Sequence, residues 1–286
     1  MQPDNLLPVT IYTPGSQMRS PVKLAKAMWQ DLKDSRELAW RLFVRDFSAR
    51  YRQSVLGIFW AFLPALLSGL VFIVLQAKAV VNFGKVDIPY PVFVIIGTTL
   101  WQIFSESIAA PLKAVQSGKS MLAKINFPRE ALIVAAFYEV LFSVAIKSVV
   151  ILAVILFFKM PLGLGLLLSI PAVLALILLG LALGLFLTPI GVLYSDIGSA
   201  LPVVIQFWFF VTPVVYPPPH SYPYSLIATF NPVGTLLVGA RDLMTKGTLL
   251  DATLFMTISA GALLGLLVAW VIYRVAMPII IERMSS

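Results

Sequence analysis

The sequence predicts an all-α membrane protein with six transmembrane helices, an N-terminal amphipathic interface helix, and re-entrant or gate helices on the outer side. Of the 286 residues, 59% are hydrophobic and only 12% are charged, whereas a soluble chain is about half apolar and about a quarter charged. The apolar runs are also long, and a spanning helix needs about 20 such residues. The expected spans are residues 58–81, 92–110, 131–158, 164–188, 201–216 and 253–273.

The chain ahead of the first expected span begins with residues 1–20, which are polar, contain three prolines and are predicted to form a flexible tail. Residues 21–55 are predicted to form a cytoplasmic amphipathic helix region, with Asp34 as N-cap and Glu37 completing a capping box. Aromatic residues share one face and arginines the other, which favours the lipid headgroup plane. The alternative is packing into a soluble core, for which about 35 residues are too few. The interface residues are Trp40, Arg41, Arg45, Arg50 and Arg52.

The distribution of positive charge predicts the orientation of the chain. If the N-terminus lies inside, fifteen of the 21 lysines and arginines fall on the cytoplasmic side, five fall outside, and Lys147 lies within a span. Cytoplasmic loops carry such an excess, so both termini are expected in the cytoplasm. The first apolar run begins near Val55, too deep for a cleavable signal peptide, and is expected to be a retained anchor.

Several classes of function are excluded by composition and motif. There is no cysteine and one histidine, His220, so thiolate chemistry and any site with two histidines are absent. Gly118-Lys119-Ser120 resembles the end of a phosphate-binding loop, but position 113, where that loop needs glycine, is Lys113. The chain is therefore expected to be no enzyme and to hold no metal or cofactor of its own. The net charge of +8 is attributed to membrane orientation and anionic lipid, not to nucleic acid.

Three ionisable residues fall at membrane depth, where burial of charge is costly and often functional. They are Glu106, Glu139 and Lys147. Glu106 is expected one turn from the cytoplasmic end of its helix, with its carboxylate reaching toward water. Glu139 and Lys147 are too far apart along one helix to pair. Each is expected to face either a partner on another helix, as a structural bond, or a hydrated path, and both alternatives stay open.

Aromatic side chains in or near the spans are candidates for a glycan path, because sugar rings pack their C–H faces on aromatic rings. For any single one of them, an interfacial or lipid-facing position is the preferred alternative. The candidates are Trp101, Phe104, Tyr138, Phe207, Trp208, Phe210 and Tyr216.

Two segments outside the spans are also distinctive. Residues 112–129 are predicted to form a short amphipathic helix that Pro111 starts and Pro128 ends, lying on lipid or docking a soluble partner. Residues 217–240 are apolar but broken by prolines, which favours a re-entrant or interfacial pair of helices on the outer side. Glycines four residues apart predict close helix approach at Gly180 and Gly184, and at Gly261 and Gly265.

Several stretches resemble one family when they are taken in order. They are residues 50–60 (RYRQSVLGIFW), residues 125–130 (INFPRE), residues 194–197 (YSDI), residues 210–217 (FVTPVVYP), Asn231-Pro232 and Arg241-Asp242. Together they resemble ABC-2-type transporter permeases, and above all those that export O-antigen, capsular polysaccharide and teichoic acid. On this resemblance, residues 56–286 form the ABC-2 transmembrane domain.

The resemblance implies a homodimer with two copies of a separate ATPase, which holds the ATP and Mg²⁺, and a lipid-linked glycan, such as a polyprenyl-linked one, as cargo. It implies that residues 117–124 form the coupling helix, through Ser117, Gly118, Lys119, Ser120, Met121, Leu122 and Lys124. The interface arginines would then attract the diphosphate of the lipid. An ABC-2 permease for a drug or another lipid is the nearest alternative. An intramembrane enzyme acting on lipid-linked sugars is another, which would need clustered carboxylates or histidines.

Overall fold

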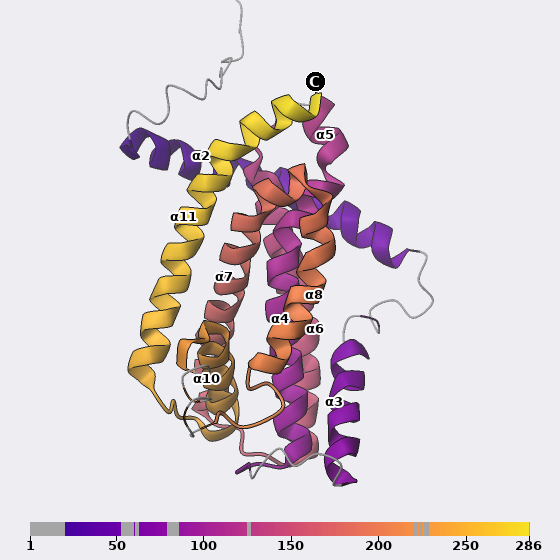
Figure 1. Cartoon of the computed structure of the whole chain (residues 1–286), viewed down its shortest axis with the longest axis vertical. Helices are drawn as coiled ribbons and strands as arrows, with labels where there is room; N and C mark the ends of the chain where they lie inside the picture. Colours follow the sequence, from indigo (N-terminus) through magenta and orange to yellow (C-terminus); the bar gives the residue numbers. More distant parts are fainter. Residues whose placement is uncertain are drawn as a thin grey trace, which may run out of the picture.

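The computed structural model describes residues 21–52, 60, 63–78, 86–124, 127–219, 222, 225 and 229–285. Their regular elements are all helices, shown in Figure 1, which confirms the all-α class. The tail predicted for residues 1–20 lies outside this part of the chain. The helices are α2 (Pro21–Tyr51), α3 (Leu63–Ala77), α4 (Tyr90–Ser117), α5 (Lys119–Lys124), α6 (Glu130–Phe157), α7 (Leu164–Leu193), α8 (Ser195–Val211), α10 (Pro232–Lys246) and α11 (Ala252–Ser285).

Four helices, α4, α6, α7 and α11, are long and apolar enough to cross a membrane. The helices at the first and fifth expected spans, α3 and α8, have 15 and 17 residues. At 1.5 Å per residue they reach about 22 and about 25 Å, less than the ~30 Å of bilayer hydrocarbon. The predicted count of six spans is therefore not confirmed by helix length.

Several prolines lie inside the long helices. Pro111 lies inside α4, which continues to Ser117, so the prediction that Pro111 starts a separate helix is wrong. Pro171 and Pro189 lie inside α7 in the same way. Membrane helices tolerate proline because neighbouring helices and side chains satisfy the backbone groups that it frees.

Helix α4 lies in the middle of the bundle and packs closely on α7 through glycines. A Cβ atom added at Gly184 would overlap the carbonyl oxygen of Ile108, and one added at Gly180 would lie 2.6 Å from the Cβ of Ser107. The close approach predicted for this glycine pair is confirmed. The prediction is wrong for Gly261, which has no atom within 4 Å of such a Cβ, because that face of α11 is exposed.

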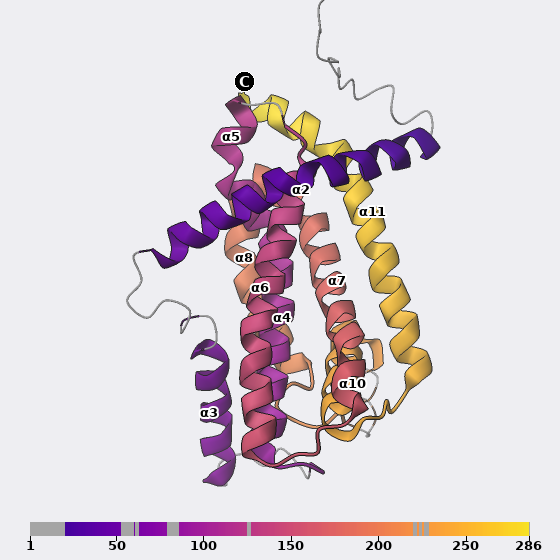
Figure 2. The same cartoon turned by 180° about the vertical axis from the view of Figure 1, so that it is seen from behind.

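Figure 2 shows α2 lying across the end of the bundle that also holds α5 and the end of α11. The helix is continuous for 31 residues, so the capping box predicted at Asp34 is wrong. Pairs four residues apart stabilise its interior instead: Gln30 donates to Asp34 at 3.3 Å, and Arg41 pairs with Glu37 at 2.6 Å.

Candidate functional site

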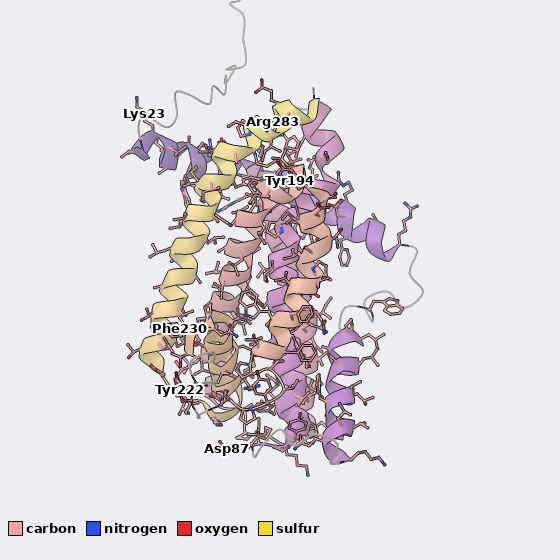
Figure 3. All side chains as sticks on the ribbon, in the orientation of Figure 1. Lys23, Asp87, Tyr194, Tyr222, Phe230 and Arg283 are labelled. Atoms are coloured by element: carbon pink, nitrogen blue, oxygen red, sulfur yellow. The ribbon has the colours of Figure 1, made fainter. Side chains whose placement is uncertain are left out.

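The candidate site has three parts, at the two ends of the bundle and at membrane depth. Figure 3 shows Lys23, Tyr194 and Arg283 at the end that carries α2 and α5, and Asp87 and Phe230 at the opposite end.

The aromatic face of α2 contacts α6. Phe47 lies 4.6 Å from Phe142 between ring centroids, and Phe43 lies 6.3 Å from Tyr138. Tyr138 thus belongs to the contact between α2 and α6. The prediction that this aromatic face meets lipid headgroups is therefore wrong for these rings, because a neighbouring helix covers them. Trp40 is different, since 56% of it is exposed.

The opposite side of α2 is exposed and charged. Arg41 pairs with Glu37, and Arg45 pairs with Asp46 at 2.8 Å, both at the surface. Arg52 is also exposed, whereas the side chain of Arg50 lies outside the described residues. Surface pairs such as these leave the arginines accessible to other anions.

A buried ion cluster fixes α2 to two other helices. Arg274 of α11 donates one guanidinium nitrogen to Asp31 of α2 at 2.6 Å and another to Glu130 at the start of α6. All three side chains are at least 85% buried. The neighbouring Tyr273 donates its hydroxyl to the carbonyl of Arg129 at 3.3 Å. Because a guanidinium presents donors in a fixed fork, one arginine holds both carboxylates and joins the three helices.

Sequence reasoning missed this cluster. It treated Arg274 as one of the positive charges that orient the chain, and it gave Asp31 and Glu130 no role. Asp31 lies 243 residues and Glu130 lies 144 residues from Arg274 along the chain, so no local pattern connects them.

Helix α5 lies at the same end of the bundle as α2 (Figure 2). Gly118 ends α4 by donating its N–H to the carbonyl of Ala114, and a Cβ there would lie 2.9 Å from a terminal methyl group of Leu132. Leu122 is buried against the bundle, Met121 is half-buried, and Ser117 and Lys119 are exposed. The side chains of Ser120 and Lys124 lie outside the described residues. Among the described side chains of this short helix, Lys119 therefore faces solvent and Leu122 faces the bundle.

At the opposite end, Asn231 holds the break between α8 and α10. Its Oδ1 accepts from the backbone N–H of Gly234 and from the indole N–H of Trp208, both at 3.3 Å. Its amide nitrogen donates to the hydroxyl of Thr212 at 2.9 Å. Asn231 is thus an N-cap for α10 that also fixes the end of α8.

Arg241 holds the same segment from α10. It is 1% exposed and donates to the carbonyls of Val214 at 2.9 Å and Pro213 at 3.3 Å. Its guanidinium lies 3.6 Å from the centroid of the Phe93 ring. The chain is not helical there, so its carbonyls need side-chain donors, and Arg241 supplies them. Residues 217–240 were predicted to be a broken, re-entrant segment. Within their described part, helix α10 begins at Pro232.

An exposed ion pair also lies at this end of the bundle. Lys246 pairs with Asp87 at 2.8 Å and lies 3.7 Å from Asp242. The hydrogen bond from Lys246 lowers the pKa of Asp87, and the same bond raises the pKa of Lys246.

At membrane depth, Lys147 pairs with Glu106 across the contact of α6 and α4. Lys147 Nζ lies 2.5 Å from Glu106 Oε2, and Ser143 donates its hydroxyl to the same oxygen at 2.6 Å. Lys113 and Glu139 form a second, longer contact of 3.9 Å between the same helices. Because α4 extends to Ser117, Glu106 lies about 16 Å from its end. The prediction of one turn was therefore wrong.

The aromatic candidates separate into core and surface. Trp101 and Phe104 are 6% and 0% exposed, and they pack on the rings of Phe209 and Trp208. The prediction that these two line a glycan path is wrong for this conformation, because the helices of the chain enclose them. Trp208, also from the predicted set, is held by Asn231.

The remaining aromatic candidates lie on and after α8. Phe207 and Phe210 are 69% and 58% exposed, and Tyr216 donates its hydroxyl to the carbonyl of Phe210 at 2.9 Å. No group of three acidic or histidine side chains suited to a metal occurs in the part of the chain that the structure describes.

The arrangement is that of an apolar helical bundle with exposed arginines and lysines at one end. At the other end, Asn231 and Arg241 hold a non-helical segment between α8 and α10. Residues 37–245 match the model of the ABC-2 type transporter family, and the chain therefore belongs to that family. It is a multi-pass membrane transporter permease.

Named relatives cover most of the chain. It is 27% identical to the O-antigen export system permease protein RfbA of Myxococcus xanthus, over 81% of this chain and 89% of the relative. It is 25% identical to the protein of the same name from Klebsiella pneumoniae, over 72% and 79%. It is 24% identical to the polysialic acid transport protein KpsM of Escherichia coli, over 82% and 91%.

Proposed function

We propose that this chain is the permease subunit of an ABC exporter that moves a lipid-linked polysaccharide, of the O-antigen, capsule or teichoic-acid type, outward across the cytoplasmic membrane. The observation that carries the proposal is the similarity, over most of the chain, to permeases for O-antigen export and polysialic acid transport. A separate ATPase supplies the energy and holds ATP and Mg²⁺, and this chain catalyses no reaction.

The working unit is a dimer of this chain with two ATPase copies, and the glycan passes between the two permeases. The end with α2 and α5 faces the cytoplasm. The excess of lysine and arginine on that side supports this orientation, as does the placement of the start of α2 and the end of α11 at one end of the bundle.

In this assembly, α5 docks on the ATPase through its exposed side, and Arg41, Arg45 and Arg52 on the exposed side of α2 attract the diphosphate of the lipid carrier. Leu122 packs α5 against the bundle, so a displacement of α5 would be transmitted to α4 and α6 through packed side chains. The Arg274 cluster ties α2 to the same end, so that the two surface elements move as one body.

Charge reversal tests the docking surface. Lys119→Glu together with Lys124→Glu should lower the yield of co-purified ATPase several-fold, because two favourable charges become repulsive toward an acidic partner surface. Lys159→Glu, at the turn between α6 and α7 near the opposite end, is the matched control and should leave the yield unchanged. Equal yields of ATPase from the wild type, the double variant and Lys159→Glu would contradict a place for α5 in the interface.

Deletion and complementation test the function itself. A strain lacking this chain should lose surface polysaccharide and accumulate lipid-linked glycan in the inner leaflet, and the wild-type chain should restore export. An inner-leaflet glycan pool that stays unchanged, with intact surface polysaccharide, would overturn the proposal and favour a drug or another lipid as cargo.

A further inference from the structure

The least buried side of α4 carries mostly polar residues, from membrane depth to the end of the helix at Ser117. From Trp101 to Ser117, the residues that are not buried fall within one face of the helix, apart from Ala114. We name this face the α4 polar stripe. Its members are Gln102, Ser105, Glu106, Ala109, Lys113, Gln116 and Ser117.

Two helices border the stripe. On one side α6 contributes Glu139 and Ser143, which contact Lys113 and Glu106. On the other side lies the start of α8, where a Cβ at Gly198 would be 3.4 Å from the amide nitrogen of Gln116. The order of these helices can be followed in Figures 1 and 2. The stripe therefore runs between α6 and α8.

The stripe extends well into the hydrocarbon level. Helix α4 is 28 residues long, which is about 42 Å, and Gln102 lies about 22 Å from its end at Ser117. Because the hydrocarbon core alone is about 30 Å thick, only the α4 residues nearest Ser117 can lie among the headgroups at this end. Gln102, Ser105 and Glu106 are thus at a depth where lipid tails would surround an outward-facing side chain.

The exposure of Glu106 is the decisive observation. Its side chain is 44% exposed, whereas its partner Lys147 is fully buried behind it. Both Lys147 and Ser143 engage Oε2, so Oε1 remains for water or a hydroxyl group. A charged side chain facing hydrocarbon is costly, and intramembrane charges normally face a bundle interior or a water-filled cavity.

We propose that the α4 polar stripe faces water and forms a wall along which the hydroxyl groups of the glycan pass in the cytoplasmic half of the membrane. The glycan part of this inference rests on the proposed function, whereas the hydration of the stripe does not. Amide, hydroxyl and carboxylate groups donate to and accept from sugar hydroxyls at many orientations. Such a wall suits a chain of repeating sugars, because no single deep site holds the cargo back.

Cysteine labelling tests the hydration of the stripe. The chain has no cysteine, so single cysteines can be introduced without a background. Ser105→Cys and Ala109→Cys are placed in the full complex in lipid nanodiscs and treated with a sulfonated maleimide. Leu141→Cys is the matched control, since Leu141 is 39% exposed on α6, two residues from Glu139 but on another face of that helix.

The stripe cysteines should react at least tenfold faster than Leu141→Cys, because a thiol becomes a reactive thiolate only where water reaches it. Both small substitutions keep the size of the side chain close to the original, and Ala109→Cys serves if Ser105→Cys does not fold. Labelling at both positions as slow as that of Leu141→Cys would overturn the inference.

Export tests the glycan contact. Gln102→Leu combined with Ser105→Ala removes polar groups while leaving the ion pair intact, and it should lower glycan export several-fold with unchanged labelling at Ala109→Cys. Unchanged export would overturn the glycan contact. If the wild-type chain exports no polysaccharide at all, the proposed function fails instead, and the labelling still decides whether the stripe is hydrated.

Discussion

Loss of the Arg274 guanidinium is predicted to destabilise the end of the bundle that carries α2 and α5. Arg274→Met keeps the length of the side chain but removes the donors that hold Asp31 and Glu130. The two carboxylates are only 15% and 6% exposed, so each loses its partner while staying out of water. Breaking a buried pair in this way costs about 3–5 kcal/mol.

The measurement is the free energy of unfolding in mixed micelles, with Arg41→Met as the matched control. Arg41 makes one ion pair, with side chains that are 73% and 77% exposed, so its removal should cost less than about 1 kcal/mol. Adding Asp31→Asn and Glu130→Gln to Arg274→Met should restore much of the loss, because no buried charge remains. If Arg274→Met lowers the free energy of unfolding no more than Arg41→Met does, the ion cluster does not stabilise this end of the bundle.

Three further predictions concern other contacts. Gly184→Ala should sharply lower the yield of folded protein, because a Cβ there overlaps the backbone of α4, whereas Gly261→Ala should leave it unchanged. Arg241→Lys should lower thermal stability and export together, because an ammonium group cannot reach both carbonyls in the fork that guanidinium provides. Asp87→Asn should remove part of the loss of stability in acid, because Lys246 lowers the pKa of Asp87 from 3.8.

The direction of the acid effect follows from that lowered pKa. A carboxyl whose pKa falls on folding adds stability above its unfolded value, and that stability is lost as the pH falls through the folded pKa. Melting temperatures of wild type and Asp87→Asn should therefore differ at pH 6, and the difference should shrink as the pH falls below 3.8 and through the lower folded pKa of Asp87. A difference in melting temperature that persists unchanged to pH 3 would contradict this account. A normal yield of folded Gly184→Ala would contradict the prediction for Gly184. Full stability and export with Arg241→Lys would contradict the prediction for Arg241.

Local pattern predicted the long helices well because their apolar runs are set by the bilayer. The starts of α6, α7 and α11 lie within one residue of the expected spans. The ends were less predictable, since α4 passes through Pro111 and α11 continues to Ser285. Those ends depend on neighbouring helices that satisfy the backbone, and no local pattern reports such neighbours.

The charges at membrane depth also show that local pattern does not report contacts between helices. Their residue types marked Glu106 and Lys147 as exceptional, but their separation along the chain did not reveal that they form a pair. The antiparallel contact of α4 and α6 brings them together, and it leaves Lys147 buried and Glu106 facing outward. The aromatic candidates Trp101 and Phe104 were misplaced for the complementary reason, because burial by α8 is not visible in their own helix.

Hydrophobic run length, charge distribution and motif order are properties of the chain alone, so they were enough to predict a membrane environment, an all-α class and the family. Which residues meet became visible only in the folded structure: Arg274 with Asp31 and Glu130, Arg241 with a non-helical backbone, and the polar members of α4 along its least buried face. Each of these depends on how whole helices pack, which is set by the sum of many weak contacts between distant segments.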